Sequence, residues 1–213
     1  MNSALWQSRE WIYHLQNRLS KGRLPGRDAQ REFSPSWAYG RHFGPLPKKY
    51  FPAAVILLLY WHDGQWWFPL TKRPDTLPDH PGQISLPGGR LEGDEMASQA
   101  ALRELHEELG VVVPSDQILG QLSSLYVYSS RHQVVPFVAQ MNERPDFRPQ
   151  AEEVASLLEV PIRYFFEKWQ PESLLQIRGT TELRFPAWRF EENVIWGATA
   201  MMLNELRWIL RDE

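Results

Sequence analysis

The sequence contains no cysteine, no long apolar segment and no strong net charge. Without cysteine, the chain has no disulfide, no thiolate ligand for a metal and no cysteine nucleophile. Its longest apolar run, residues 53–61, has the length of a strand and is much shorter than the ~20 residues that cross a bilayer. The formal net charge of −3 gives no electrostatic basis for binding nucleic acids. The first residues lack the pattern of a secretory signal, so we expect a cytoplasmic protein that binds neither membranes nor nucleic acids.

The 213 residues have the composition of a globular protein, with 43% hydrophobic and 23% charged residues. Ile12, Leu15 and Leu19 recur at helical spacing, and glycine and proline then punctuate residues 20–50. We therefore expect an N-terminal helix and an irregular surface arm in residues 1–50, and the main domain in residues 51–213. The sequence leaves open whether the arm covers the domain, pairs with a second copy in a homodimer or shapes a pocket.

The apolar pattern of the main domain changes repeatedly between strand and helix periods. It predicts strands at residues 53–60, 66–71, 83–86, 111–113, 118–128 and 134–141, and a hairpin over residues 174–185 that stops at Pro186. It predicts helices at residues 94–109, 152–158, 162–169 and 195–210, the first of them ended by Gly110. Strands mixed with helices favour an α/β or α+β sandwich.

Three glutamates crowd one face of the helix predicted for residues 94–109. With Glu104 at zero on a helical wheel, Glu107 and Glu108 fall about 60° and 40° to either side. Like charges at this spacing repel by roughly 0.2–0.5 kcal/mol per pair, and the helix dipole disfavours anions in the last turns. A divalent cation would reverse both effects, and oxygen ligands without cysteine favour Mg²⁺ or Mn²⁺ over zinc. A solvated helix face is the alternative interpretation of the same residues.

The residues around these glutamates follow a fixed spacing. Gly89 is followed after five residues by Glu95, and after seven more by the run Arg103-Glu104-Leu105-His106-Glu107-Glu108-Leu109-Gly110-Val111. This segment resembles the Nudix box, which reads G, five residues, E, seven residues and R-E-U-x-E-E-x-G-U, where U is apolar. The resemblance implies a Nudix fold, which is an α/β/α sandwich with a mixed sheet. It also implies a hydrolase that uses water and a divalent metal to cleave a nucleoside diphosphate linked to another group.

The resemblance assigns roles to individual residues. The metal ligands that it implies are Glu104, Glu107 and Glu108. Glu95 and Arg103 would fix the loop and the helix to each other. Farther along, Glu153 stands in an E-V-A segment where related proteins supply an additional carboxylate, with the start of a surface helix as the alternative interpretation. Glu104 and Glu153 are the two candidates for the general base, and the sequence does not choose between them.

The segment before the box reduces the number of candidate substrates. Its candidate substrate-binding residues are Lys72, Arg73, His80, Gln83, Ser85, Gly88 and Gly89. Their order resembles the motif of the coenzyme A diphosphatase subfamily, approximately L-L/V-T-K-R-S-x-x-L/M-R-x-H-x-G-Q-V/I-x-F-P-G-G. The positions that depart from the motif are Pro69, Pro74, Pro78 and Leu86. Pro78 matters most, because it replaces an arginine that would bind a phosphate.

The subfamily resemblance implies that coenzyme A and water give 3′,5′-ADP and 4′-phosphopantetheine. Lys72 and Arg73 would bind phosphate, with a solvated strand end as the alternative. His80, Gln83 and Ser85 would either orient the substrate or pin the loop. The candidates for an aromatic wall around the pantetheine arm, unless they belong to the core, are Phe51, Trp66 and Tyr126.

Two other functions stay open. One is a Nudix hydrolase that acts on ADP-ribose, NADH or nucleoside triphosphates. The other belongs to a different class, a catalytically silent Nudix domain that senses a ligand. Such domains usually lose carboxylates of the box, whereas this chain keeps all of them.

Overall fold

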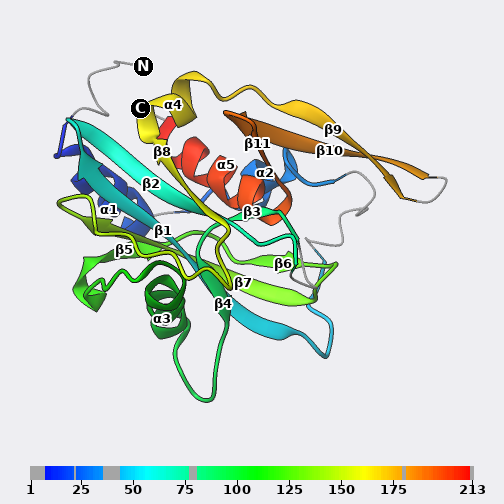
Figure 1. The fold of residues 1–213 in the computed structure, drawn as a ribbon, viewed down its shortest axis with the longest axis horizontal. Helices are drawn as coiled ribbons and strands as arrows, with labels where there is room; N and C mark the ends of the chain where they lie inside the picture. Colours follow the sequence, from blue (N-terminus) through cyan, green and yellow to red (C-terminus); the bar gives the residue numbers. More distant parts are fainter. Residues whose placement is uncertain (1–7, 22, 36–43, 77–80, 179–180, 212–213) are drawn as a thin grey trace.

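The computed structural model describes residues 8–21, 23–35, 44–76, 81–178 and 181–211. Within these residues the strands form one eight-stranded sheet and one three-stranded sheet. Figure 1 shows helix α3 (Ala97–Leu109) on one side of the larger sheet and helix α5 (Gly197–Arg211) on the other. The smaller sheet lies on the α5 side and contacts that helix.

The larger sheet is built around strand β1 (Phe51–His62). β1 pairs antiparallel with β2 (Gln65–Lys72) and parallel with β7 (His132–Met141). The remaining strands join these three: β3 (Ile84–Ser85) and β8 (Ser156–Pro161) pair with β2, β4 (Gly88–Arg90) pairs with β1, and β5 (Ile118–Gln121) and β6 (Leu125–Val127) pair with β7. Parallel and antiparallel pairs in one sheet confirm the predicted mixed sheet.

Alternate residues of β1 belong to two separate hydrophobic clusters. Ala54 and Ile56 pack with the apolar face of α3. Ala53 and Leu57 pack on the opposite face, in the cluster that contains helix α1 (Trp11–Lys21) and α5. Successive side chains of a strand point to opposite faces, so a strand covered on both faces needs a continuous apolar run. The predicted α/β fold, with a mixed sheet between helices, is confirmed.

The smaller sheet has the order β11-β10-β9, with β9 at Glu172–Arg178, β10 at Thr181–Phe190 and β11 at Asn193–Trp196. β10 continues through Pro186, where the sequence predicted its end. Proline has no N–H to donate to a neighbouring strand. β11 pairs with β10 only from Ala187 to Phe190, so Pro186 lies outside that pairing and its missing N–H costs no hydrogen bond to β11. Helix α4 (Ile162–Glu167) precedes this sheet, as predicted.

The helix predicted at residues 152–158 is wrong. A turn at residues 151–153 leads into β8, which pairs with β2 from Lys72↔Ser156 to Trp67↔Pro161. A segment of this length could form a short helix or a strand. Leu158 and Val160 are buried at the period of two that a strand has, and pairing with β2 selects the strand. Residues 111–113 form no strand and lead to a 3₁₀ turn at Ser115–Gln117. The single strand expected at residues 118–128 is divided into β5 and β6, with residues 122–124 between them outside the strands.

The segment predicted to be an irregular surface arm contains helix α2 (Arg27–Arg31) and the fully buried Phe33. The buried carboxylate of Glu205 in α5 accepts hydrogen bonds from the Gly26 N–H, the Gln30 side chain and the Ser123 N–H. These partners lie far apart in sequence, so local patterning did not show that α2 packs on α5. No helix in the described part of the chain combines the length and apolar character needed to span a membrane.

Candidate active site

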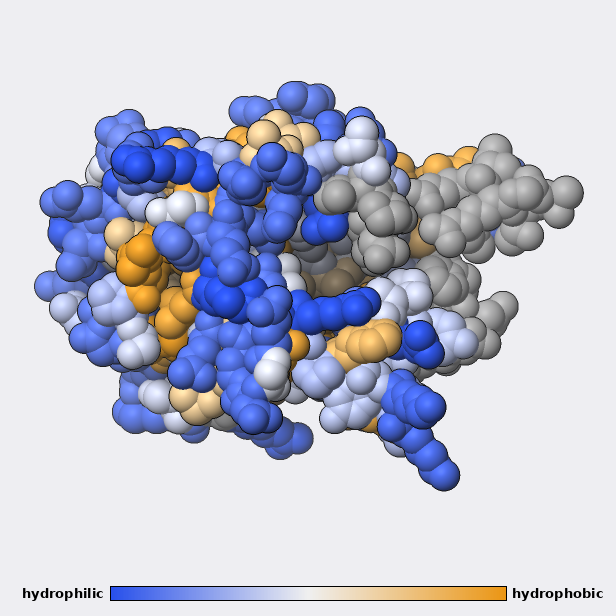
Figure 2. Space-filling model, turned by 60° about the horizontal axis from the view of Figure 1, so that its bottom comes forward, coloured by the Kyte–Doolittle hydropathy of each residue, from blue (hydrophilic) through white to orange (hydrophobic). Residues whose placement is uncertain are grey.

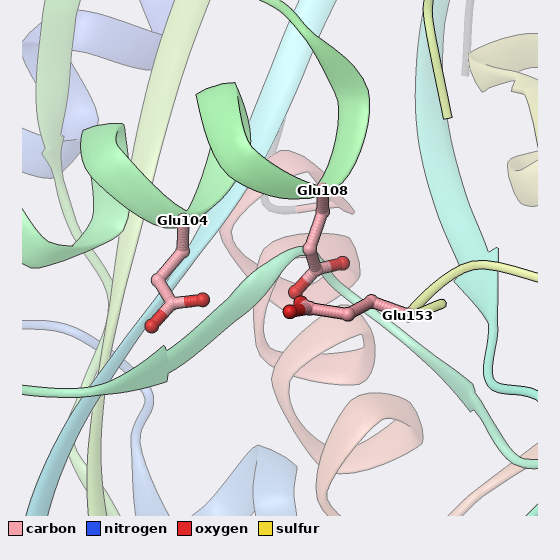
Figure 3. Close-up of side chains that lie close together, drawn as sticks. All are labelled: Glu104, Glu108 and Glu153. Carbon is pink, nitrogen blue, oxygen red and sulfur yellow. The ribbon is translucent and has the colours of Figure 1, made fainter. Parts of the chain in front are cut away.

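Three glutamate side chains meet beside strand β4. Glu104 and Glu108 extend from α3, and Glu153 reaches toward them from the turn before β8 (Figure 3). One carboxylate oxygen of each residue lies within 4.8 Å of the other two. Among the described residues, this acid cluster is the one group of three or more acids or histidines that is close enough to share a metal ion.

Both ends of helix α3 are fixed. At its start the Met96 N–H donates to Gln99 Oε1 at 2.8 Å. At its end Gly110 adopts a left-handed conformation, with φ of 69°, and its N–H donates to the carbonyl of His106 at 2.8 Å. Leu105 is fully buried against the sheet. The helix therefore cannot easily rotate, and the glutamates of its neighbouring face keep their orientation toward β4.

Glu108 is the buried member of the acid cluster, with 5% of its surface exposed. Its Oε1 accepts a hydrogen bond of 2.9 Å from the N–H of Gly88 in β4. Burial raises the pKa of this carboxyl to about 7, and the nearby charges of Glu104 and Glu153 add to the increase. The hydrogen bonds from Gly88 and Thr71 oppose it. A bound cation would strongly stabilise the charged form of a buried carboxylate that lies beside two others.

Glu104 lies directly against Gly89, the first residue of the Nudix-like segment. A Cβ at Gly89 would lie 2.5 Å from Cδ of Glu104, which no real pair of carbon atoms tolerates. Glycine is therefore required for the Glu104 carboxylate to occupy this position. Burial also raises the pKa of Glu104, and the hydrogen bond from Arg103 Nη1 at 3.0 Å opposes this effect.

Arg103 ties helix α3 to the loop that follows β4. Its Nη2 donates to Glu95 Oε1 at 2.7 Å and to the carbonyl of Arg90 at 3.0 Å. Its Nε donates to the other oxygen of Glu95 at 3.2 Å. Glu95 also accepts the N–H of Glu92 at 2.7 Å, and the hydrogen bonds from Arg103 lower the pKa of the Glu95 carboxyl. These contacts hold β4 and its two glycines against the acids of α3.

Glu107 lies outside the acid cluster. Its side chain is 49% exposed, and its Oε2 accepts a hydrogen bond of 2.7 Å from Arg103 Nη1. The positions of the residues around the helix axis explain why Glu107 is exposed and Glu108 is buried. On the helical wheel Leu105 lies about 100° from Glu104, in the same direction as Glu108 and in the opposite direction from Glu107. Because Leu105 packs on the sheet, Glu108 lies close to the sheet and Glu107 points toward solvent. The structure thus brings Glu153 to Glu104 and Glu108, and the role of Glu107 as a metal ligand stays a prediction.

A cavity of about 510 Å³ lies on the α5 side of the glycines of β4. Gly88 and Gly89 form part of its wall and contact the acid cluster with their other side. Most of the lining is apolar, with Val55, Leu86 and Met202 as examples. Figure 2 brings the α3 end of the molecule forward, where the surface is mainly hydrophilic. The mainly apolar lining of the cavity contrasts with that hydrophilic surface at the α3 end.

The structure places the predicted substrate-binding residues in different surroundings. Those that line the cavity are Arg73, Gln83, Ser85, Gly88 and Gly89. Lys72 does not line it; its carbonyl accepts the N–H of Ala155 at 2.8 Å, which joins β2 to the chain just before β8. His80 lies outside the described residues.

The candidates for an aromatic wall, Phe51, Trp66 and Tyr126, do not line this cavity, and Trp66 and Tyr126 follow the alternative of core packing. Trp66 and Tyr126 are buried, and Phe51 is 37% exposed at the start of β1. Among the described residues, the aromatic side chain of Phe, Trp or Tyr type that lines the cavity is Trp196, at the junction of β11 and α5. Thr199 of the same junction donates to the carbonyl of Ile84 at 3.2 Å and so closes the cavity against β3. The small residues around Trp196 in the sequence were the available signal for this close contact.

Comparison with known proteins agrees with this geometry. Residues 49–176 match the NUDIX domain family. The chain is 35% identical over 138 residues to a Yersinia enterocolitica protein named Uncharacterized Nudix hydrolase NudL, a match that covers 64% of this chain and 70% of the relative. A Yersinia pestis protein of the same name is 33% identical over 139 residues, which is 64% of this chain and 69% of the relative.

The crystal structure of a MutT/nudix family protein from Enterococcus faecalis has the same fold. It matches with a TM-score of 0.53 at 17% identity, over 93% of this chain and 73% of that chain. The family match spans more than half of the sequence and includes the helix, the glycines and the acids described above. The chain belongs to the Nudix hydrolase family, whose members hydrolyse nucleoside diphosphates linked to another group.

Proposed function

We propose that this protein hydrolyses the diphosphate bond of coenzyme A or its thioesters, with Mg²⁺ or Mn²⁺ as cofactor. The products would be 3′,5′-ADP and 4′-phosphopantetheine or its acyl form. The observation that carries the proposal is the position of Gly88 and Gly89, between the acid cluster and an apolar cavity. A substrate whose diphosphate lies at these glycines would have room in the cavity for an apolar arm.

The acid cluster has the donor chemistry that a hard divalent cation needs. It offers three carboxylate oxygens within 4.8 Å of one another. Oxygens bound to the same Mg²⁺ are at most about 4.2 Å apart, so small rotations of the side chains suffice. A bound cation supplies positive charge to the phosphate oxygens and lowers the pKa of a bound water. Glu107 would have to leave Arg103 in order to join these ligands.

Glu153 is our candidate for the general base. It is exposed, whereas Glu108 is buried and Glu104 accepts a hydrogen bond from Arg103. A base must reach the attacking water, so an exposed carboxylate at the edge of the cluster suits this role. Glu104 is the alternative, and its contact with Arg103 would then have to loosen during turnover.

The lining of the cavity favours a pantetheine arm over a second sugar. Val55, Leu86 and Met202 offer no hydrogen bonds, and the polar residues of the lining, among them Gln83 and Ser85, would orient the amides of the arm. The second ribose of ADP-ribose or the nicotinamide of NADH would leave polar groups against apolar side chains, which is costly. The retained acids argue against a catalytically silent domain.

Product analysis by mass spectrometry tests this proposal. Coenzyme A, acetyl-coenzyme A, ADP-ribose and NADH are each incubated with the protein in Mg²⁺, in Mn²⁺ and in EDTA. We expect 3′,5′-ADP from coenzyme A in the presence of metal, and no product in EDTA or with the Glu108→Gln variant. Faster turnover of ADP-ribose or NADH would reject coenzyme A as the substrate. Hydrolysis that persists in EDTA would reject the metal site.

A further inference from the structure

Four cations surround an exposed aromatic ring next to the cavity. We call this group the basic patch and define it as Lys48, Lys49, Arg90, Arg131 and Phe51. Apart from Arg90, these residues and Tyr50 line a surface hollow of about 460 Å³. All four cations are exposed, and Phe51 is 37% exposed. Residues 48–49, Arg90 and Arg131 come from three separate parts of the sequence and form a positively charged surface region on a protein whose net charge is −3.

The backbone holds much of the basic patch in place. The N–H of Phe51 donates to the carbonyl of Arg131 at 2.9 Å, and Phe51 pairs with His132 at the start of the β1–β7 ladder. Arg131 adopts a left-handed conformation, with φ of 58°, at the end of the loop between β6 and β7. A side chain at such a position is uncommon outside glycine and asparagine. The backbone conformation of Arg131 is therefore less favourable for arginine than it would be for glycine.

The aromatic ring orients the two guanidinium groups. The Arg90 guanidinium carbon lies 4.2 Å from the centre of the Phe51 ring, and that of Arg131 lies 5.4 Å away. Arg90 also donates from Nε to Nε2 of His132 at 2.9 Å. Stacking uses the face of a guanidinium and leaves the N–H groups in its plane free to bind an anion.

No carboxylate in the described part of the chain forms an ion pair with these four cations. By contrast, Arg103, Arg144 and Arg163 each pair with a glutamate. Cations that gather without a carboxylate partner repel one another, and a doubly charged anion between them removes that repulsion. The charge and geometry of the basic patch suit a phosphate monoester.

The basic patch is continuous with the active site. Arg90 follows Gly88 and Gly89 directly in β4, and its side chain lines the same cavity as they do. Gly88 pairs with Val55, which lies four residues along β1 from Phe51. At about 3.3 Å per residue, the backbone of Phe51 is about 13 Å along β1 from Val55, which pairs with Gly88. The 3′- and 5′-phosphates of one ribose are closer together than this, so the long arginine and lysine side chains of the patch would have to reach toward the glycines to contact a 3′-phosphate.

We propose that the basic patch binds a phosphate monoester on the ribose of the substrate, separate from the diphosphate that is cleaved. This inference rests on the proposed function, because coenzyme A carries such a group at its 3′ position and ADP-ribose and NADH do not. It assigns recognition of that phosphate to Lys48, Lys49, Arg90 and Arg131, in place of Lys72. The apolar cavity and the patch would then hold opposite ends of one substrate.

A binding experiment tests the basic patch without relying on hydrolysis. Isothermal titration calorimetry compares adenosine 3′,5′-bisphosphate with 5′-AMP, using the wild type and the variant Lys48→Gln/Lys49→Gln/Arg131→Gln in EDTA. Arg90 is left intact because it also lines the cavity beside Gly88 and Gly89. We expect the wild type to bind the bisphosphate about tenfold more tightly than AMP, because charge-assisted contacts to phosphate are strong. The variant should bind the two nucleotides equally, with its affinity for AMP nearly unchanged.

A matched control removes charge of the same kind elsewhere. The variant Arg163→Gln/Lys168→Gln loses exposed cations at α4 and should keep the wild-type preference. Thermal melting of all variants checks that they fold. Equal binding of the two nucleotides by the wild type, or a preference that survives in the patch variant, would overturn the proposal.

Hydrolysis separates failure of this inference from failure of the proposed function. The ratio of kcat/KM for coenzyme A to that for 3′-dephospho-coenzyme A should fall about tenfold in the patch variant and stay unchanged in the control. If neither compound is hydrolysed while the binding preference is lost in the patch variant, the proposed function fails and the phosphate site stands. If both are hydrolysed with the same ratio in wild type and variant, the phosphate site fails and the diphosphatase function stands.

Discussion

Replacing Glu108 by glutamine is expected to change how the stability of the metal-free protein depends on pH. Glu108 is 5% exposed, and burial raises the pKa of its carboxyl from 4.5 to about 7. Between these two pH values the folded chain keeps a proton that the unfolded chain has already lost. The free energy of unfolding therefore falls as the pH rises through this window.

The size of the effect follows from the two pKa values. Their difference corresponds to about 3 kcal/mol of stability that is present below pH 4.5 and lost by pH 8. Glutamine is neutral throughout, so Glu108→Gln removes this loss and the variant becomes more stable than the wild type at pH 8. Glu104, whose pKa burial also raises, leaves a smaller dependence of the same sign in the variant.

Urea unfolding in EDTA at pH 5 and pH 8 measures the difference directly. Part of this stability is already lost at pH 5, so the wild type should lose roughly 2 kcal/mol more than Glu108→Gln between these two conditions. The exposed Glu143→Gln serves as a control and should follow the wild type. Identical losses in the wild type and in Glu108→Gln would show that this carboxyl is not held in a costly charged state, which would refute the reasoning.

Three further predictions concern the glycine, the box and the N-terminal segment. Gly89→Ala places a methyl group on the Glu104 carboxylate, so we expect Mn²⁺ affinity to fall by about tenfold or more with folding retained, as metal titration and circular dichroism would show. Glu108→Gln should abolish most hydrolysis without unfolding the protein; the box spacing alone predicts the same for Glu107→Gln, whereas the position of Glu107 outside the acid cluster predicts a weaker effect, and steady-state rates with coenzyme A distinguish the two. Glu205→Ala leaves buried donors of Gly26 and Gln30 without their acceptor, and we expect a loss of about 3 kcal/mol in denaturant unfolding and faster hydrogen exchange in α2.

Periodicity along the chain was sufficient for the central elements. The continuous apolar run of β1 indicated a strand covered on both faces, and each of its two sets of side chains packs in its own cluster. The spacing of Leu105 and Leu109 indicated the buried face of α3, and Gly110 indicated its end. These features depend on residues that are neighbours in sequence, and local patterns report such contacts well.

Contacts between distant segments account for the errors. Residues 152–158 became a turn and a strand because β2 offers an edge for pairing. The same change moves Glu153 from the first turn of a surface helix to the acid cluster. Helix α2 depends on Glu205 at the other end of the chain. No local pattern contains either partner.

The site itself was foreseen in part. The spacing of Glu104, Glu107 and Glu108 predicted shared carboxylates, and the structure brings two of them together with Glu153. The sequence predicted the same role for Glu107 and Glu108, although the wheel angles could have distinguished them, because Glu108 lies on the side of the buried Leu105 and Glu107 does not. The place of Trp196 in the cavity depends on how α5 packs over β3, which sequence spacing does not contain.

Metal binding by single variants tests the central claim most directly. Mn²⁺ is titrated into the wild type and into Glu104→Gln, Glu107→Gln, Glu108→Gln and Glu153→Gln, and the bound ion is followed by electron paramagnetic resonance. The account predicts that loss of any member of the acid cluster weakens binding about tenfold or more, and that loss of Glu107 has a smaller effect. Wild-type affinity in the Glu104, Glu108 and Glu153 variants would contradict it.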